Sequence, residues 1–408
     1  MVTASPSEGT HATRIRPPGG PRDIVVAGAG PAGLAAALEC HRRGHGTVIV
    51  APPRGGRDQR TAALLAGSVA LLQRLGVWDL LAEKAPMRSL RIVDATRRLI
   101  RAPEVTFHAS EIGLPAFGYN VRNADLVDAL ERRAAEEGLD RIETTVVGVA
   151  PGPDAIDLDL GSGETLTARL VVAADGRRST IREAVGIDVT DWRYDQSALV
   201  VNLAHALPHN DTSTEFHTET GPLTLVPLAG RRSSLVWVDR PDEVARRVAI
   251  DEAALAGEIE ARTSSLLGAI RIDGPRQAFS LSGMTALGFA RARTVLVGEA
   301  AHLFPPIGAQ GLNLGYRDVR ALGEILPPPG RDPGAPSRLA AYERARRTDV
   351  VSRTTAVDAL NRTLLTGFLP VQALRGLGLF LLDRVPSLRR AVMRQGVAAP
   401  PERPAQRL

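Results

Sequence analysis

The chain has 408 residues, of which 44% are hydrophobic and 23% charged, with 50 basic and 45 acidic side chains. This balance describes a globular protein of about two domains and excludes an intrinsically disordered chain. The single cysteine, Cys40, excludes an intrachain disulfide, and no apolar run reaches the roughly 18 residues that a membrane-spanning helix requires. The net charge of +5 comes from arginines scattered among acids, which argues against a nucleic-acid partner.

The first half of the chain predicts an α/β domain. Residues 1–22 are rich in Ser, Thr, Pro and Gly and predict a disordered tail, not a signal peptide, so we expect a cytoplasmic protein. An apolar strand over 23–27 is followed by a glycine-rich turn, a helix over 31–43 and a second strand over 47–50, the order of a βαβ unit. The elements expected next are a helix over 61–75, strands over 90–99 and 104–108, a helix over 123–137, and strands over 141–149, 155–160, 164–168 and 170–174.

The second half changes character. Residues 192–240 alternate with period two and are broken by Pro and Gly, which favours an antiparallel sheet. A helix over 251–267, a buried strand over 294–297 and mostly helical sequence beyond 314 follow. We therefore predict an α/β fold with the following parts: a discontinuous Rossmann-type domain (23–90, 115–190 and 290–345), an inserted β-rich substrate domain (91–114 and 191–289), a C-terminal helical segment (346–395) and a second tail (396–408).

The first strand leads into the motif Gly28-Ala-Gly30-Pro-Ala-Gly33. In a dinucleotide fingerprint the first glycine permits the tight turn and the second lets a pyrophosphate approach the backbone. The third lets the helix pack closely on the strand. The free N–H groups of the helix N-terminus then face the phosphates. The strand–turn–helix context on both sides supports a nucleotide-binding reading.

The acidic residue that usually ends the second strand and binds the ribose hydroxyls is missing, since the sequence reads Val50-Ala-Pro-Pro-Arg54. Two interpretations remain open at this point. Arg54 binds the 2′-phosphate of NADP in a nicotinamide-binding domain, or the ligand is FAD and another group holds its adenosine end.

Two later motifs each follow a buried strand. Asp175-Gly176 comes directly after the strand that ends at residue 174. The strand over 294–297 leads into Gly298-Glu299 and His302, then into a Pro/Gly loop and a helix. That loop reads Pro305-Pro306-Ile-Gly308-Ala-Gln310-Gly311-Leu312-Asn313.

These three stretches, in this order, resemble the FAD site of the single-component flavin-dependent aromatic hydroxylases, which share the fold of p-hydroxybenzoate hydroxylase. Further stretches resemble the ubiquinone-biosynthesis hydroxylase branch of that family: residues 60–65, 75–78, 117–120, 192–196, 208–209, 215–216, 221–223 and 235–237. The resemblance covers residues 23 to about 360. It implies FAD as the cofactor and NAD(P)H as co-substrate, and so favours the second interpretation over the Arg54 one.

The resemblance also implies roles for single residues. Asp175 and Gly176 are expected beside the FAD pyrophosphate and the approach of the nicotinamide. Glu299 stands where the family usually has Asp and is expected to contact a ribityl hydroxyl. Arg60 and Arg122 match, less closely, family arginines near the flavin and the pyrophosphate.

The loop that precedes the last helix is the expected catalytic centre, with Pro306, Gly308, Gln310 and Gly311 as its candidate residues. Backbone N–H groups of Gly311, Leu312 and Asn313 are expected to face the flavin edge where negative charge builds on reduction. Pro306 is expected on the oxygen-reactive side of the ring. His302 is interpreted as a hydrogen-bonded structural residue, and no His/Cys cluster has metal-ligand spacing.

The implied function is an FAD-dependent monooxygenase that uses O₂ and NAD(P)H to hydroxylate an aromatic ring through a C4a-hydroperoxyflavin. A polyprenylated phenol of ubiquinone biosynthesis is the favoured hydrophobic substrate. The alternatives are a hydroxylase of another aromatic metabolite and a catalytically weak flavoprotein that serves as an assembly partner in a biosynthetic complex. Residues 363–394 are apolar and then arginine-rich, which fits either peripheral contact with the inner membrane or a helix packed on the protein or on the second subunit of a homodimer.

Overall fold

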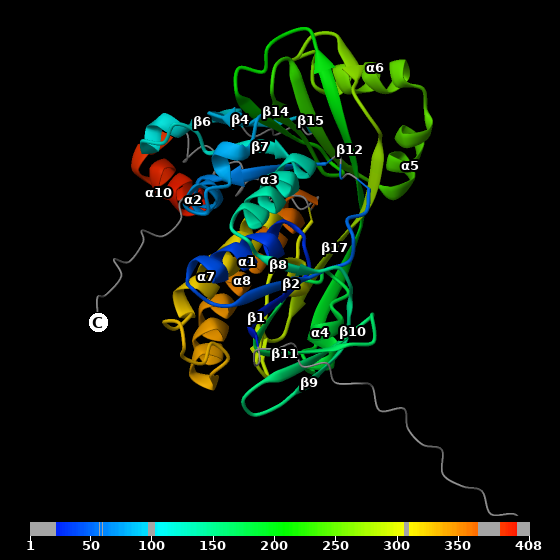
Figure 1. The fold of residues 1–408 in the computed structure, drawn as a ribbon. Coiled ribbons are helices and arrows are strands. Elements are labelled where there is room, and N and C mark those ends of the chain that lie inside the picture. The colour runs from blue at the N-terminus through cyan, green and yellow to red at the C-terminus, as the bar shows by residue number, and fades with distance from the viewer. Residues whose placement is uncertain are drawn as a thin grey trace, which may run out of the picture.

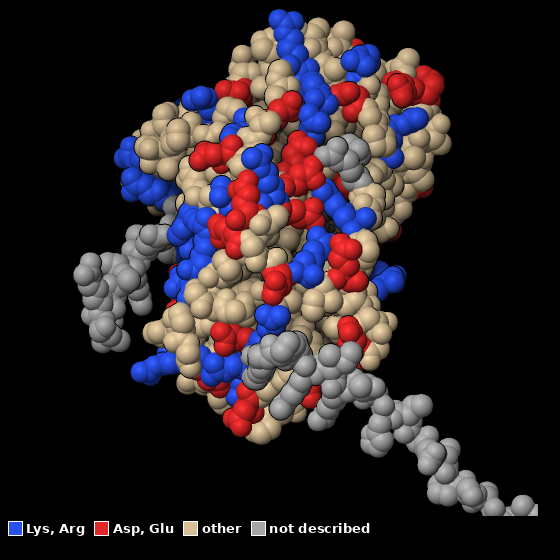
Figure 2. Space-filling model, in the orientation of Figure 1, with Lys and Arg blue, Asp and Glu red and all other residues tan. Residues whose placement is uncertain are grey.

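The computed structural model describes residues 22–56, 58, 60–96, 103–305, 310–365 and 384–397. Two large sheets organise these residues, one mainly parallel and one mainly antiparallel, and they lie in the lower and upper halves of Figure 1. The predicted mixed α/β class is confirmed. Acidic and basic side chains are interspersed over the face drawn in Figure 2.

The first sheet carries the βαβ unit that the sequence predicts. Its central strands run in the order β19 (Thr294–Leu296), β11 (Thr165–Ala173), β1 (Arg22–Ala27), β2 (Thr47–Val50) and β8 (Asp140–Ile142), and all are parallel. Residues 24–27 of β1 are at most 2% exposed, because the β-branched and small apolar side chains are covered on both faces of the sheet. Three strands extend this sheet by antiparallel pairing: β9 (Val146–Pro151), β10 (Ile156–Leu160) and β18 (Ala290–Arg291).

Helices gather around this sheet. α1 (Pro31–Arg42) follows β1 directly and contacts α3 (Asn123–Glu136) and α7 (Gln310–Ile325), and α7 contacts α8 (Pro336–Leu365). β1, α1 and β2 begin and end within one residue of the predicted limits. Among the described residues, no helix combines the length and the apolar character that crossing a bilayer requires.

The second sheet is built from strands distant in sequence. Its order is β20 (His302–Leu303), β17 (Gln277–Ala286), β12 (Val189–His205), β15 (Arg232–Asp239), β14 (Pro222–Leu228), β13 (Thr212–His217), β5 (Ser89–Asp94) and β6 (Val105–His108), with β16 (Ile270–Ile272) beside β12. α5 (Pro241–Ala249) and α6 (Glu252–Arg262) accompany it at the upper right of Figure 1, over a core that includes Leu199, Trp237 and Ile259.

Some predictions were wrong in part. The strand expected over 141–149 is divided into β8 and β9, and the two strands expected over 164–168 and 170–174 are one continuous strand, β11. The segment 61–75 was expected as one helix, but its first five residues form β3 (Thr61–Leu65), and only then does α2 (Ala66–Arg74) begin. β3 pairs with β7 (Gly118–Arg122), which in turn pairs with β4 (Ala85–Met87). The apolar run has no helical signature of its own, so its distant partner strand decides its conformation.

Candidate active site

The glycine turn after β1 satisfies two internal requirements. Gly28 has φ +113°, and a Cβ built on it would lie 2.2 Å from the carbonyl oxygen of Ala174. A Cβ on Gly33 would lie 2.2 Å from the carbonyl oxygen of Gly28. Any side chain at either position would displace backbone, so the turn and the packing of α1 both need glycine.

Gly30 is different, because nothing inside the protein requires it to be glycine. Its φ of −73° suits any residue, and a Cβ there would meet no atom within 4 Å. It is also the N-cap of α1, where no side chain caps the helix and the first turn holds no acid. The N–H groups of this turn therefore face open space at the positive end of the helix dipole, which suits a diphosphate.

Asp175 leaves an oxygen atom without a protein partner. It follows β11, and its Oδ2 accepts a hydrogen bond of 3.3 Å from the backbone N–H of Ile181, in the first turn of α4 (Thr180–Ala184). Its Oδ1 is buried and has no hydrogen-bond partner among the described residues. Burial raises the pKa of this carboxyl. An unsatisfied buried oxygen beside the glycine turn indicates a place for a ligand's polar group.

The three motifs meet around the start of α1. A Cβ built on Gly298 would lie 3.1 Å from the Cβ of Ala32, and one on Gly315 would lie 3.3 Å from the same atom. Ala174, which Gly28 approaches, directly precedes Asp175. The turns after β1, β11 and β19 therefore lie together at the carboxyl ends of three neighbouring parallel strands. Open α/β sheets bind their ligands in the crevice at this edge, and the three turns line its expected position.

Arg182 links the second motif to the third. Its side chain is 5% exposed, and Nη1 donates to the carbonyl oxygens of Arg177, at 3.0 Å, and Ala300, at 3.1 Å. Two turns that are separated by more than a hundred residues are thus held by one guanidinium.

Asp318 of α7 binds the turn after β19, which carries Gly298, Glu299 and His302. Its Oδ2 accepts hydrogen bonds from the N–H of Gly298, at 2.9 Å, and from Nε2 of His302, at 2.7 Å, and its Oδ1 accepts one from Nε of Arg346, at 2.7 Å. The Asp318, His302 and Arg346 side chains are at most 4% exposed. Burial alone would lower the pKa of Arg346, but the charges of Asp318, Tyr342 and Asp349 and the hydrogen bond to Asp349 together outweigh it and raise that pKa. His302 is therefore hydrogen bonded inside the protein, in line with its structural interpretation.

Glu299 lies at the centre of this turn, in the short helix η3 (Gly298–Ala300), and is exposed. Its charge helps to raise the pKa of Arg60, after the larger effect of Asp58, so the two side chains are near one another. Arg60 donates to Asp58 through Nε, at 2.9 Å, and Nη2, at 2.8 Å, and lies 5.3 Å from the ring centre of Phe279 on β17. Arg60 thus connects the crevice to the second sheet.

The loop before α7 is described only in part. Pro306 and Gly308 lie outside the described residues, and Gln310 is the first residue of α7. A Cβ on Gly311 would meet nothing within 4 Å, so packing within the protein does not require glycine at this position, as it does not at Gly30. Leu312 is half-buried. The first N–H groups of any helix have no partner within the helix itself, so a helix start of this kind can serve a ligand.

Asn313 is anchored through its side chain. Oδ1 accepts from the N–H of Leu65, at 2.8 Å, and from Oγ of Ser68, at 2.6 Å, while Nδ2 donates to the carbonyl of Ala63, at 2.8 Å. These bonds tie the start of α7 to β3 and α2. The Asn313 side chain therefore positions the start of α7.

Arg122 and Arg54 both have acidic partners. Nη2 of Arg122 donates to Glu83 at 2.7 Å, and this bond, more than nearby Asp125, raises the Arg122 pKa. Arg54 is paired with Asp128 and Glu131 of α3. Arg122 lies opposite Thr61 on the neighbouring strand, so it is close to Arg60, and its place near the pyrophosphate stays a prediction. Arg54, the cation invoked for an NADP 2′-phosphate, already has two acidic partners.

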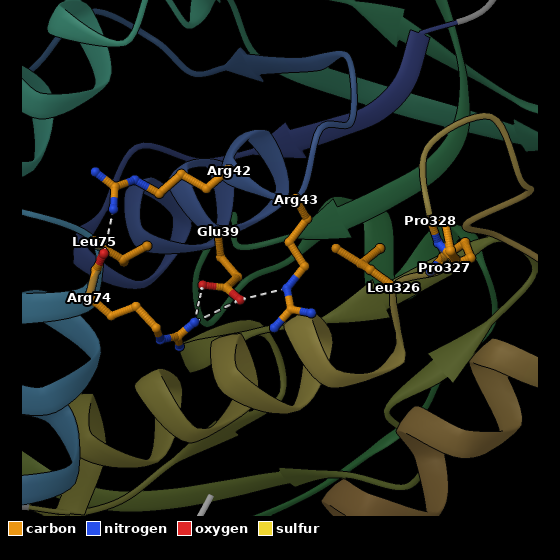
Figure 3. Close-up of a pocket in the computed structure, with 8 residues that line it drawn as sticks. All are labelled: Glu39, Arg42, Arg43, Arg74, Leu75, Leu326, Pro327 and Pro328. Carbon is orange, nitrogen blue, oxygen red and sulfur yellow. Dashed lines mark hydrogen bonds and ion pairs between the residues drawn. The ribbon is translucent and has the colours of Figure 1, made fainter. Parts of the chain in front are cut away.

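A hollow of about 610 Å³ lies at the other end of α1 (Figure 3). Its lining residues are Glu39, Arg42, Arg43, Arg74, Leu75, Leu326, Pro327 and Pro328. The buried Glu39 carboxylate pairs with Arg43 at 2.9 Å and with Arg74 at 2.8 Å, so the charges that face the hollow are matched within the protein. α1 has 12 residues and separates this hollow from the crevice by about 18 Å.

Comparison with known proteins decides the family. The family described as "FAD binding domain" matches residues 22–357. The chain belongs to this family of FAD-dependent monooxygenases. This FAD-binding monooxygenase is 34% identical to the ubiquinone hydroxylase UbiL of Rhodospirillum rubrum, over 92% of the chain and 89% of that protein. It is 31% identical to the 3-demethoxyubiquinol 3-hydroxylase of Escherichia coli, over 92% of the chain and 98% of that protein.

A solved structure supports the same fold. Klebsiella pneumoniae HpxO, in complex with FAD and uric acid, has a TM-score of 0.73 at 18% identity, over 92% of this monooxygenase and 97% of HpxO. The chain is an FAD-dependent aromatic hydroxylase, and the expected cofactor is confirmed. The crevice fits FAD, since it offers the open Gly30 turn, the buried Asp175 oxygen and the exposed Glu299 carboxylate.

Three residues that shape this crevice were missed in the sequence analysis. Arg182, Asp318 and Arg346 are all nearly fully buried and charged. A signal exists for Asp318, because it lies between Tyr316 and Val319, which are buried, on the face of α7 that packs inward. A charged residue at such a position indicates a buried partner, but the partner itself could not be named from the sequence.

Proposed function

We propose that this hydroxylase acts on a polyprenylated phenol of ubiquinone biosynthesis, with NAD(P)H as reductant and O₂ as the source of the inserted oxygen atom. The observation that carries the proposal is the similarity to two ubiquinone-pathway hydroxylases, at 34% and 31% identity over 92% of the chain in each case. The likeness is spread over both sheets, so it includes the second sheet, where the family places the substrate. No activity for this chain is inferred from the fold alone.

The residues of the crevice have separate tasks in this reaction. The first turn of α1 at Gly30 would bind the diphosphate, and Glu299 would accept a hydrogen bond from a ribityl hydroxyl. Bound FAD supplies the redox chemistry, the acceptance of hydride and the activation of O₂. The N–H groups of Gly311, Leu312 and Asn313 would stabilise the negative charge that builds at the flavin edge on reduction, and losing one such donor typically costs about 3 kcal/mol.

A second candidate is hydroxylation of another aromatic metabolite. HpxO has the same fold and was solved with uric acid, a compact polar ring and not a prenylated one. Shape and polarity of the pocket on the second sheet therefore choose the substrate within the family.

The test is turnover by the purified, flavin-loaded protein. We expect NADPH oxidation to rise at least tenfold with a short-chain prenylated phenol, and the product to gain the mass of one oxygen atom. The unprenylated phenol and uric acid serve as matched comparisons. If either of these is hydroxylated with a higher kcat/KM than the prenylated phenol, the second candidate replaces the first.

A control variant checks that turnover arises in the crevice. Gly311→Val adds bulk where no protein atom is near, so the variant should fold and retain FAD but hydroxylate at least a hundredfold more slowly. Undiminished hydroxylation by this variant would contradict the role given to the start of α7.

A further inference from the structure

The last described helix, α10 (Pro386–Val397), is fastened to the protein by one face. Arg389 donates to both carboxylate oxygens of Glu111, at 2.6 and 2.8 Å, and its guanidinium lies 4.7 Å from the ring centre of Phe107. Met393, one turn further on, is 5% exposed and belongs to a small apolar cluster with Val105. Figure 1 places α10 at the left edge of the molecule.

A second face of α10 is apolar and exposed. Val385, just before the helix, is 37% exposed, Leu388 is 43% exposed and Val392 is 44% exposed. Their spacing of three and four residues puts them in one stripe along the helix. They make up three of the seven large hydrophobic side chains that are exposed within the described part of the chain. Exposed hydrophobic side chains are therefore clustered at α10 and occur singly elsewhere.

The charges of α10 all have one sign. The helix contains Arg389, Arg390 and Arg394 and no acid. Arg390 and Arg394 are exposed and have no ion pair with a described residue. At 100° per residue they lie roughly opposite the stripe. The left edge of Figure 2 accordingly shows a group of basic side chains where Figure 1 draws α10.

The stripe is too small for a stable protein partner. A specific interface buries about 800 Å² on each side, which three half-exposed aliphatic side chains do not supply. A second copy of the chain, packed stripe to stripe, would leave Arg390 and Arg394 on the opposite face of each helix without acidic partners. A bilayer needs no complementary shape, and its anionic headgroups would match the unpaired arginines.

We propose that α10 docks the protein on an anionic membrane surface. Val385, Leu388 and Val392 enter the headgroup region, while Arg390 and Arg394 are attracted by lipid phosphates within a Debye length of about 8–10 Å. This docking goes beyond the hydroxylation reaction and does not depend on the identity of the substrate. It would place the enzyme where lipid-soluble molecules are found.

The test is co-sedimentation of the full-length, FAD-loaded protein with vesicles, in the absence of any substrate. We expect at least tenfold tighter binding to phosphatidylglycerol vesicles than to phosphatidylcholine vesicles, and weaker binding as salt is raised. Equal binding to the two lipids, or none to either, overturns the proposal.

Two pairs of variants locate the contact. Arg390→Gln with Arg394→Gln should weaken binding roughly thirtyfold, since each arginine near the surface is worth about fivefold. Leu388→Ser with Val392→Ser should weaken it at least tenfold. The matched controls are Arg132→Gln with Arg240→Gln, and Leu287→Ser, which change exposed residues of the same types elsewhere. Flavin content should be normal in all of them.

Two outcomes contradict the assignment to α10. Wild-type affinity in both α10 double variants would mean that another part of the chain meets the vesicles. A dimer in sedimentation velocity that Leu388→Ser with Val392→Ser dissolves would mean that the stripe is covered by a second copy. Because no turnover is measured, these results are independent of the proposed substrate.

Discussion

The two ends of helix α1 deal with charge in opposite ways. At the C-terminal end, Arg43 and Arg74 share the buried carboxylate of Glu39 (Figure 3). Arg42 pairs with Glu137. At the N-terminal end no side chain caps the helix, and the Gly30 turn opens on empty space. The hollow of about 610 Å³ is therefore at the C-terminal end of α1, where the charged side chains already have partners. The FAD site is at the N-terminal end, where the helix has no side-chain cap. In this protein, uncapped N–H groups indicate the cofactor site better than the volume of a cavity does.

The first prediction separates the two ends most strongly. Gly30→Glu puts a negative side chain into the space that the diphosphate would take, so FAD affinity should fall at least a thousandfold, about 4 kcal/mol. The apoprotein should unfold at the wild-type temperature, since a Cβ at Gly30 meets no protein atom. Flavin absorbance and fluorescence titration of the apoprotein measure both effects. Gly257→Glu, at an equally open glycine on α6, is the control and should bind FAD normally.

The second prediction concerns the acid beneath the crevice. Asp318→Asn removes the charge of the more buried of the two carboxylates that pair with Arg346, the other being Asp349 at 2.9 Å, and should destabilise the protein by about 3 kcal/mol. Because Asp318 also holds the N–H of Gly298, FAD should bind roughly tenfold more weakly. Urea unfolding of the apoprotein and flavin titration give the two numbers. Unchanged FAD affinity in a destabilised variant would show that Asp318 supports the fold without positioning the turn.

The third prediction makes the matching change at the far end of α1. Glu39→Gln removes a carboxylate that is 3% exposed, but its two arginine partners are about 40% exposed and can turn to water. We expect a loss of about 1–2 kcal/mol in urea unfolding, and FAD affinity within twofold of wild type. A large drop in FAD affinity would erase the contrast between the two ends.

The smallest expected effect is the pH dependence of protein stability that arises from Asp58, the partner of Arg60. Burial would raise the pKa of Asp58, but hydrogen bonds from Arg60 and Asn123 outweigh it and lower the pKa to about 2. This contribution to stability is complete above the unfolded value near 4 and is lost as pH falls from about 4 to about 2. Asp58→Asn should therefore cost about 1 kcal/mol or less at neutral pH, since both side chains are at least one-third exposed. The difference from wild type should vanish near pH 2, as measured by urea unfolding across this range.

The sequence was sufficient to predict the parts of the site that consist of residues consecutive in the chain. The strand, turn and helix around Gly28, Gly30 and Gly33 follow one another within residues 22–42, and those around Asp175 and Glu299 do so within 165–184 and 294–325. The glycine turn could be interpreted from its strand–turn–helix context, whereas Asp175 and Glu299 were assigned by their resemblance to the motifs of the family.

The contacts that assemble these turns could not be read in this way. Arg182 bonds to Ala300, 118 positions away, and Arg346 bonds to Asp318, 28 positions away. An arginine in a sequence does not indicate which residue it will contact. The strand β3 was mistaken for helix for the same reason, because its pairing with β7 lies more than fifty residues away. Long-range pairing overrides weak local preference in both cases.

The order of strands in the first sheet has a consequence for when the protein acquires its cofactor. β19 is synthesised after almost three-quarters of the chain, yet it lies beside β11 and carries the turn that completes the crevice. A nascent chain shorter than about 320 residues lacks Asp318 and so cannot hold that turn in place. We therefore expect full flavin affinity only after α7 has left the ribosome, however early the glycine motif emerges.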